Sequence, residues 1–236
     1  MKITYSDFYN EIEMGNHPWA IKKYKNILKG LLDNSKITED GIIKVSWADE
    51  EDILRVHSLS YLKKLQSGKL SPEEERLSEL PLSENPLGLY QLFSTFAEGT
   101  IKACEYAMQD GVCVHLGGGM HHSYSQYGTG FCMINDLAVA ARASQHYSSV
   151  ENIIIVDCDL HQGDGTANIF KDDKSVFTFP IHQKNLFPYW KQKSNLDIEL
   201  KNETEDDEYP ELQVIEQLRF PFFYPEYYST SSKVNS

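Results

Sequence analysis

The sequence contains few cysteines, no C-x-x-C pair and no long apolar run. Its 236 residues include 4 cysteines, far below the density of a disulfide-stapled secreted domain. No uninterrupted apolar stretch approaches the roughly 18 residues that a membrane-spanning helix requires. The N-terminus also lacks the apolar segment of a signal peptide. These absences predict a cytoplasmic protein with neither a membrane anchor nor a membrane partner.

Positive charge is also scarce. There are 22 Lys and Arg residues against 35 Asp and Glu residues, which gives a formal net charge of -13 at pH 7. A field of this sign repels the phosphates of nucleic acids, so we expect no direct nucleic-acid partner. The hydrophobic fraction of 41% and the charged fraction of 24% are typical of a globular chain. They exclude a collagen, a coiled coil and a disordered protein.

Apolar patterns predict alternating helices and strands. Short apolar runs separated by helix-sized connections indicate parallel strands, so the predicted fold class is α/β, with a parallel sheet covered by helices on both faces. The segment at 69–86 contains three prolines and three consecutive glutamates and is predicted to be a solvated connector. The predicted helices are 18–32, 46–54, 58–66, 89–108 and 137–144, and the predicted strands are 112–116, 153–156 and 176–179.

The most informative segment follows the strand predicted at 153–156 and reads D-C-D-L-H-Q-G-D-G. Strand alternation places Asp157, Asp159 and His161 on one side, at the carboxyl end where α/β sheets form ligand sites. Two carboxylates and an imidazole that converge there favour a divalent cation, and oxygen and nitrogen donors suit zinc. The alternative is that Asp157 and Asp164 only cap turns around the neighbouring glycines.

A second segment follows the strand predicted at 112–116. It reads G-G-G-M-H-H and continues to G-T-G-F-C-M-I-N-D. Three glycines permit a tight turn, and the adjacent His121 and His122 are placed to act as paired acid/base groups. A lone histidine is more often packed in a core or on the surface, but that explanation is weaker for a doublet after three glycines. Gly130 allows a sharp turn that presents Phe131 as an apolar wall.

Together these segments resemble the arginase/deacetylase superfamily and, within it, the zinc-dependent histone deacetylase and acetylpolyamine amidohydrolase family. The combination of G-G-G-M-H-H, G-F-C-x-x-N-D and D-x-D-x-H-x-G-D-G is long and specific. It is supported by R-V-H-S at 55–58 and I-H-Q at 181–183, and the resemblance extends over roughly residues 16–209. The ureohydrolase branch, which uses two manganese ions, is a poorer match because the G-G-G-x-H-H and G-F-C segments are deacetylase features.

The resemblance implies a role for each residue of the two motifs. Asp159 and His161 would be zinc ligands. His122 would be the general base and acid, oriented by Asp164, and His121 would be the neighbouring imidazole.

Other features of the family concern its second cation and its substrate. His121 would pair with Asp157, and a monovalent-cation (K⁺) site would use Asp157, Asp159 and nearby carbonyls. The residues Gly130, Phe131 and Phe187 would line a tunnel for an acyl-lysine-like side chain. The implied reaction is hydrolysis of the acetyl amide of an acetyl-lysine or an acetylpolyamine.

The chain also departs from the family pattern. Where the family shows H-P-x-x-x-x-R, this chain has H-P-W-A-I-K-K, so Lys23 stands in place of the arginine. The family's third zinc ligand, a later Asp, and its carbonyl-polarising Tyr, which follows Gly-Gly, have no match, since the last glycine is Gly165 and the last aspartate is Asp207. We therefore expect a partial domain at 1–209, lacking the C-terminal part of the fold, and a divergent, poorly ordered tail at 210–236.

Two functional hypotheses follow. The first is a zinc-dependent deacetylase acting on an acetylated amine, either a protein lysine or a small molecule. The second is a catalytically incomplete metal-binding fragment or interaction module of the same family. Both predict zinc affinity, but they differ in turnover, because a catalytic zinc usually has three protein ligands and the sequence offers two.

Overall fold

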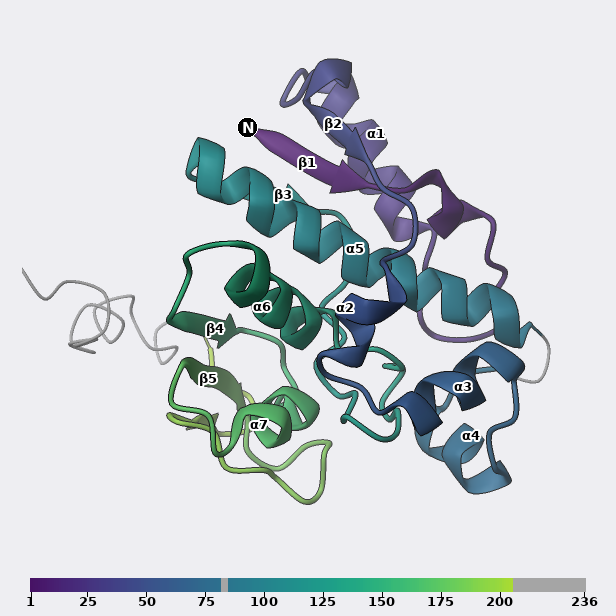
Figure 1. The fold of residues 1–236 in the computed structure, drawn as a ribbon, viewed down its shortest axis with the longest axis vertical. Helices are drawn as coiled ribbons and strands as arrows, with labels where there is room; N and C mark the ends of the chain where they lie inside the picture. The colour runs from purple at the N-terminus through teal and green to yellow at the C-terminus, as the bar shows by residue number, and fades with distance from the viewer. Residues whose placement is uncertain (82–84, 206–236) are drawn as a thin grey trace, which may run out of the picture.

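The computed structural model describes residues 1–81 and 85–205, and its α/β architecture confirms the predicted fold class (Figure 1). The predicted tail at 210–236 lies outside the described residues. The strands are β1 (Lys2–Tyr5), β2 (Ile42–Lys44), β3 (Cys113–His115), β4 (Ile153–Asp157), β5 (Val176–Gln183) and β6 (Ile198–Leu200). The helices are α1 (Lys23–Asp33), α2 (Glu50–Leu54), α3 (Leu59–Ser67), α4 (Pro72–Ser78), α5 (Pro86–Asp110), α6 (Asp136–Tyr147) and α7 (Asp164–Phe170), with the 3₁₀ helices η1 (Asp7–Asn10) and η2 (Glu39–Gly41).

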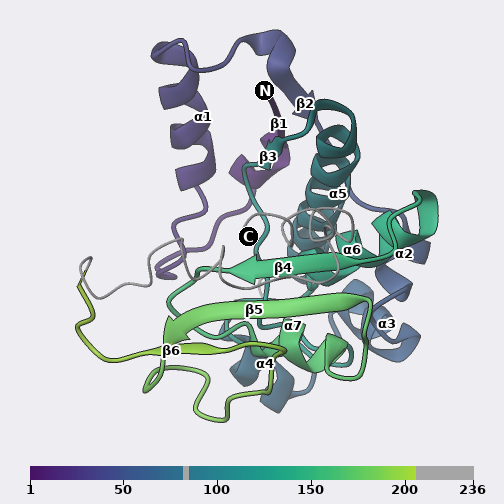
Figure 2. The ribbon, with the colours of Figure 1, turned by 90° about the vertical axis from the view of Figure 1, so that its left-hand side faces the viewer.

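All strand pairs among the described residues are parallel, and they form two three-stranded sheets. The first has the order β2-β1-β3, and in it Ile3 is aligned with Ile42 on one side and with Val114 on the other. The second has the order β4-β5-β6, with Ile153 aligned with Val176. Figure 2 shows α1 and α5 on opposite sides of the first sheet. Helices therefore shield apolar strands on two faces, as expected for parallel sheets.

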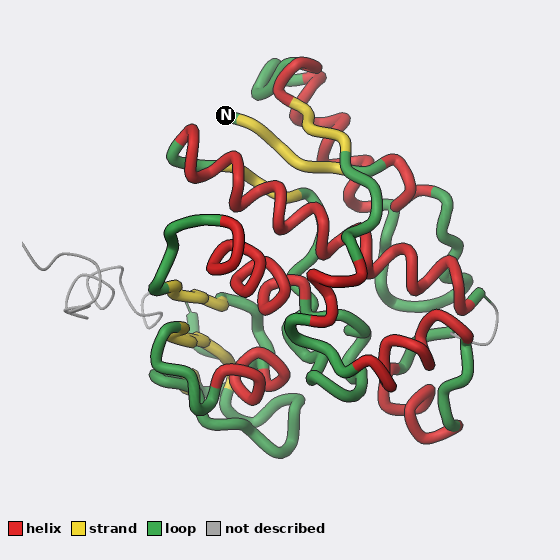
Figure 3. The backbone as a smooth tube through the Cα atoms, in the orientation of Figure 1, coloured by secondary structure: helices red, strands yellow, loops and turns green. Residues whose placement is uncertain are grey.

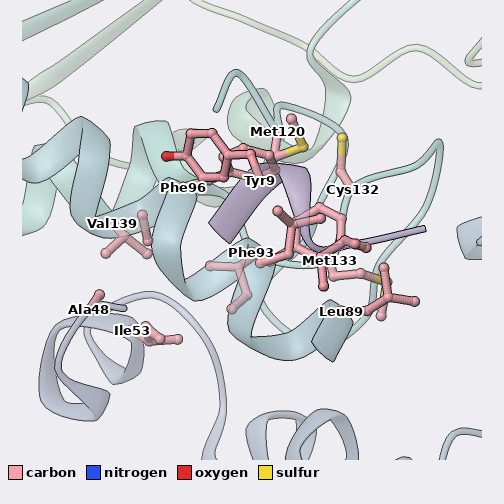
Figure 4. Packing of buried hydrophobic residues seen from close by; sticks show 14 of the residues in the cluster. Tyr9, Ala48, Ile53, Leu89, Phe93, Phe96, Met120, Cys132, Met133 and Val139 are labelled. Atoms are coloured by element: carbon pink, nitrogen blue, oxygen red, sulfur yellow. The ribbon is translucent and has the colours of Figure 1, made fainter. Parts of the chain in front are cut away.

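Helix α5 forms the centre of the core. It begins at Pro86, where the side chain of Asn85 accepts a hydrogen bond from the Gly88 amide, and it ends at Asp110, followed by Gly111 in a left-handed conformation. Phe93 and Phe96 on its buried face pack against residues of distant segments (Figure 4). The helical periodicity predicted over 89–108 is thus confirmed, and this helix supports both the first sheet and α6.

Two predicted helix starts were wrong by a few residues. Helix α1 begins at Lys23 rather than at Pro18, because residues 18–22 form turns in which the Trp19 amide donates to His17 Nδ1. Helix α2 begins at Glu50, with Asp49 as its N-cap residue, so no capping box starts at Ser46.

The predicted connector at 69–86 was also wrong, because it contains α4. Ser71 and Glu74 form a reciprocal capping box, and Pro72 occupies the first turn. The segment is also not simply solvated. The amides of Gly130 and Phe131 donate to the carbonyls of Leu77 and Ser78, at 3.2 and 2.9 Å. Helix α4 therefore anchors the loop that carries two of the predicted substrate-binding residues.

None of the helices in the described part of the chain combines the length and the apolar character that crossing a membrane requires.

The long connection from β3 to α6 contains neither a helix nor a named strand (Figure 3). This connection carries the histidine doublet.

Candidate active site

All nine predicted site residues line one pocket, with a volume of about 1210 Å³. They are His121, His122, Gly130, Phe131, Asp157, Asp159, His161, Asp164 and Phe187. Three segments supply them: the loop after β3, the carboxyl end of β4 with the start of α7, and the loop after β5. Lys23, which replaces the family's arginine, lines the same pocket. The residues of the sequence motifs therefore come together in one pocket.

The triple glycine makes the turn that brings the histidines to the pocket. Gly118 has a φ of +70°, and a Cβ there would lie 2.3 Å from Asp136 Oδ2. Any side chain would thus meet both backbone strain and a collision. The close approach lets Asp136 accept hydrogen bonds from the amides of Gly119 and Met120, at 3.1 and 2.7 Å.

Asp136 is buried, and its position in the sequence gave no hint of this role. Burial raises the pKa of Asp136, while the Thr100 hydroxyl and two backbone amides donate to its carboxylate. The side chain belongs to the first residue of α6, so it joins that helix to the turn before His121. Asp136 therefore fixes the histidine segment to the start of α6.

A second set of hydrogen bonds, which starts from the R-V-H-S segment, also fixes the histidine segment. His57 Nε2 accepts a hydrogen bond from the Asn135 amide at 3.0 Å. The Asn135 side chain donates in turn to the Ser123 carbonyl and to the Thr166 hydroxyl, each at 3.0 Å. These bonds join the residue after the histidine doublet to α7, which carries Asp164. Burial lowers the pKa of His57 to about 4, so this imidazole is neutral and serves as an acceptor.

His121 pairs with Asp157. Nδ1 of His121 lies 2.6 Å from Asp157 Oδ2, and the other oxygen of this carboxylate accepts from the Asp159 amide at 3.0 Å. Burial opposes the charged form of His121, but the hydrogen bond and the charge of Asp157 outweigh it, so the pKa of His121 is raised. Burial likewise acts against the Asp157 carboxylate, and the contact with His121 outweighs it, so the pKa of Asp157 is lowered.

His122 pairs with Asp164 in a similar way but with the opposite outcome. Its Nδ1 lies 2.6 Å from Asp164 Oδ1. Burial lowers the pKa of His122, and the nearby His121 and His161 add to this effect, whereas Asp164 opposes it. Because the carboxylate accepts from Nδ1, Nε2 is left as the proton acceptor of the ring. The His121 and His122 ring centroids are 4.1 Å apart.

Asp159 and His161 lie beside the histidine pairs and are suited to hold a metal. Asp159 Oδ1 and His161 Nδ1 are 3.1 Å apart, and their side chains are 51% and 36% exposed. Two ligands of a tetrahedral zinc, each about 2.0 to 2.1 Å from the metal, lie roughly 3.3 Å apart. The donor types and their separation therefore fit two positions of a zinc site. No cluster of three or more metal-ligating side chains occurs within 1–81 and 85–205.

Aromatic rings form a wall beside His122. The Phe187 ring meets the His122 ring edge to face, with centroids 4.9 Å apart, and the Phe131 ring meets that of His17 at 4.5 Å. A Cβ at Gly130 would lie 2.7 Å from His122 Cδ2 and 2.9 Å from Phe187 Cε1. Because Gly130 has no Cβ, its loop can approach the rings of His122 and Phe187 closely.

Known proteins with related sequences identify the family. A sequence model of the histone deacetylase domain matches residues 17–228, which is most of the chain. The chain therefore belongs to the histone deacetylase family.

Two curated relatives agree with this assignment. An uncharacterized protein of Picosynechococcus sp. is 37% identical over 199 residues, which cover 84% of this chain and 65% of that protein. Histone deacetylase 2 of Arabidopsis thaliana is 27% identical over 218 residues, which cover 89% of this chain and 56% of that protein. The chain thus spans less than two thirds of the length of either relative.

A solved structure shares the fold. The crystal structure of an HDAC homologue from Aquifex aeolicus aligns with a TM-score of 0.74 at 22% sequence identity. The alignment covers 92% of this chain and 65% of that chain. The parallel, helix-covered architecture is therefore that of the family.

Proposed function

We propose that this chain acts as a zinc-dependent deacetylase, hydrolysing the acetyl amide of an acetyl-lysine or of an acetylpolyamine. One observation carries the proposal. Two histidine–aspartate pairs, the exposed Asp159 with the half-buried His161, and two aromatic rings line a single pocket at the carboxyl end of β4. Membership of the histone deacetylase family supports the same reaction class.

Asp159 and His161 would hold the zinc ion. When bound, zinc lowers the pKa of a coordinated water and polarises the carbonyl oxygen of the substrate. The third protein ligand and the carbonyl-polarising tyrosine predicted from the family have no counterpart assigned among the described residues. The proposed K⁺ site at Asp157 and Asp159 stays a prediction.

His122 would move the protons of the reaction. Asp164 holds its Nδ1–H, and the lowered pKa leaves Nε2 unprotonated near neutral pH, ready to accept a proton from the attacking water. The same nitrogen then gives that proton to the amine as the C–N bond breaks. The second proton of the water passes from the acetic acid formed to the amine, so the products are acetate and the protonated amine, and one water molecule is consumed.

His121 would have an electrostatic role. Its raised pKa means that it retains a proton at a higher pH than His122 does, so its charge can stabilise the negative charge that develops at the carbonyl carbon's oxygen. Phe131 and Phe187 would flank the apolar chain that leads to the amide. The Phe187 ring, which contacts the His122 ring, would exclude water from that side of the imidazole.

The second hypothesis, a metal-binding module without turnover, has one observation in its favour. Two candidate zinc ligands come together in the described ranges, and catalytic zinc usually has three protein ligands. Such a module would bind zinc weakly and would not hydrolyse the amide.

A chelation experiment separates these hypotheses. We expect the purified chain to hydrolyse an acetyl-lysine peptide or an acetylpolyamine, to lose this activity on removal of metal by a chelator, and to regain it with zinc. Comparing the two substrates at equal concentration identifies the preferred amine. Zinc binding without hydrolysis of either substrate would reject the deacetylase proposal and favour the module.

A further inference from the structure

The second oxygen of Asp164 has a partner that neither the family motifs nor the proposed mechanism uses. While Oδ1 of this carboxylate faces His122 Nδ1 at 2.6 Å, Oδ2 accepts a hydrogen bond from the Tyr124 hydroxyl at 2.9 Å. Tyr124 lies two residues after His122 and 40 residues before Asp164. The carboxylate is therefore held at both ends, once by the histidine that it orients and once by a tyrosine.

The other histidine–aspartate pair is held in a different way. Asp157 also uses both oxygens, but its second oxygen accepts from the backbone amide of Asp159. A backbone donor is present whatever the side chain is. The Tyr124 hydroxyl, by contrast, depends on the identity of one residue, so substitution can remove it from one pair and leave the other intact.

Tyr124 is itself fixed by its surroundings. Its ring stacks on that of Tyr127, with centroids 4.6 Å apart and an interplanar angle of 12°. Its backbone amide donates to the Tyr127 carbonyl at 3.0 Å, and the residue is 8% exposed. Burial and the charge of Asp164 raise the pKa of Tyr124, so the hydroxyl keeps its proton and remains a donor. A rigid donor with a fixed direction is therefore aimed at Asp164.

We propose that Tyr124 is a positioning residue, whose hydroxyl fixes the rotation of the Asp164 carboxylate and thereby the plane of the His122 ring. Without this donor, Oδ2 becomes a buried acceptor with no partner among the described residues, and the carboxylate can rotate to find another. The His122 ring then loses its single orientation. The catalytic consequence rests on the proposed function, whereas the hydrogen-bond geometry does not.

The test is the isosteric substitution Tyr124→Phe, observed by NMR of the zinc-loaded, ¹⁵N-labelled full chain. The two imidazole N–H protons bound to Asp157 and Asp164 are assigned with His121→Ala and His122→Ala. We expect the His122 proton to shift or broaden in Tyr124→Phe while the His121 proton is unchanged. The matched control, Tyr147→Phe on an exposed tyrosine that does not line the pocket, should leave both unchanged.

Turnover adds a second readout. If the wild-type chain hydrolyses an acetyl-lysine peptide, Tyr124→Phe should lower kcat by about 10-fold or more, as loss of an outer hydrogen bond does in comparable sites, with KM and zinc content unchanged. An unchanged kcat, or equal shifts of both histidine protons, would overturn the proposal. Absence of turnover in the wild type would reject the proposed function but leave the NMR comparison decisive.

A third measurement needs no variant, so it also covers the case in which Tyr124→Phe fails to fold. In the wild-type chain, the Tyr124 hydroxyl proton should exchange with water slowly enough to be observed. The hydroxyl of Tyr189, whose residue is 84% exposed, serves as the fast-exchanging reference. Equal exchange of the two hydroxyl protons would overturn the proposal.

Discussion

The two histidine–aspartate pairs share one geometry and differ in their chemistry. In each pair, Nδ1 lies 2.6 Å from a carboxylate oxygen, and both imidazoles are buried. Yet the pKa of His121 is raised, whereas the pKa of His122 is lowered. The charges around each ring explain the difference. Burial acts in the same direction on both, but three carboxylates act on His121, while His121 and His161 act against a charge on His122.

A paired carboxylate therefore does not decide by itself which histidine is the base. The pKa is raised for the ring surrounded by more carboxylates and lowered for the ring that faces two other imidazoles. This difference supports the division of labour proposed for the two residues, with His122 moving protons and His121 carrying charge.

The largest expected effect concerns Asp159 and His161, the two proposed zinc ligands. Asp159→Ala and His161→Ala should each abolish stoichiometric zinc binding and with it any hydrolysis, because each removes one of two adjacent donors. Zinc content after dialysis is measured by atomic absorption. His122→Ala is the control and should retain zinc. Wild-type zinc content in both ligand variants would contradict the assignment.

Replacing one carboxylate at a time by an amide tests whether the two histidine–aspartate pairs have different roles. Asp164→Asn should lower kcat by about 10² to 10⁴-fold, because an amide can hold His122 in the wrong tautomer and so remove the general base. Asp157→Asn should lower kcat less, since His121 moves no proton in the proposed reaction. Steady-state kinetics of the two variants at equal zinc content provide the measurement. Equal losses would show that the pairs are equivalent.

A smaller effect is expected from crowding the His122 pair alone. In Gly130→Ala, the added methyl group meets the rings of His122 and Phe187. We expect kcat/KM to fall by about 10-fold or more because the base is displaced. Gly15→Ala is a matched control, since its φ of +55° resembles the +52° of Gly130 but its Cβ meets nothing within 4 Å.

Both glycine variants should lose about 1 to 2 kcal/mol of stability from the left-handed backbone. Denaturant unfolding measures this loss, and kinetics measure the activity. If Gly130→Ala kept wild-type kcat/KM at a similar loss of stability, the close packing around His122 would have no catalytic meaning.

The smallest effect is a difference in titration between the two rings. In the metal-free protein, NMR titration should show His121 with a pKa above the ordinary value of 6.5 and His122 with a pKa below it. The His121 pair then stabilises the fold fully below pH 6.5 and less as the pH rises through its folded pKa. Protonation of His122 destabilises the fold as the pH falls below 6.5 toward its folded pKa. The reverse order of the two pKa values would contradict the comparison.

Long, regular patterns in the sequence were sufficient to predict the helices and strands at the centre of the fold. The apolar face of α5 buries many residues at helical spacing, so its periodicity was a sufficient signal. Strand β4 coincides with an uninterrupted apolar run, although its residues are only partly buried and Val156 is exposed. Strands β1 and β2 were missed because three or four mixed residues such as Lys2–Tyr5 carry no period. The capping box of α4, formed by Ser71 and Glu74, is visible in the sequence. The helix was missed because the three glutamates and three prolines of this segment indicated a connector.

The sequence indicated those candidate site residues that belong to local motifs. Each candidate ligand and each histidine of the doublet lies in a short, dense motif, and all of them line one pocket in the structure. Asp136 and Tyr124 were not predicted, because their roles depend on contacts with residues 16 and 40 positions away. Only the turn geometry of the glycines and the start of α7 place those partners within hydrogen-bond distance.

Side-by-side kinetics of His122→Ala and His121→Ala, at matched zinc content and on an acetyl-lysine peptide, test the central claim most directly. We expect His122→Ala to lose about 10² to 10⁴-fold in kcat with zinc retained, because the general base is gone, and His121→Ala to lose less. A fall smaller than about threefold in His122→Ala, or a larger loss in His121→Ala, would contradict the assignment of His122 as the base.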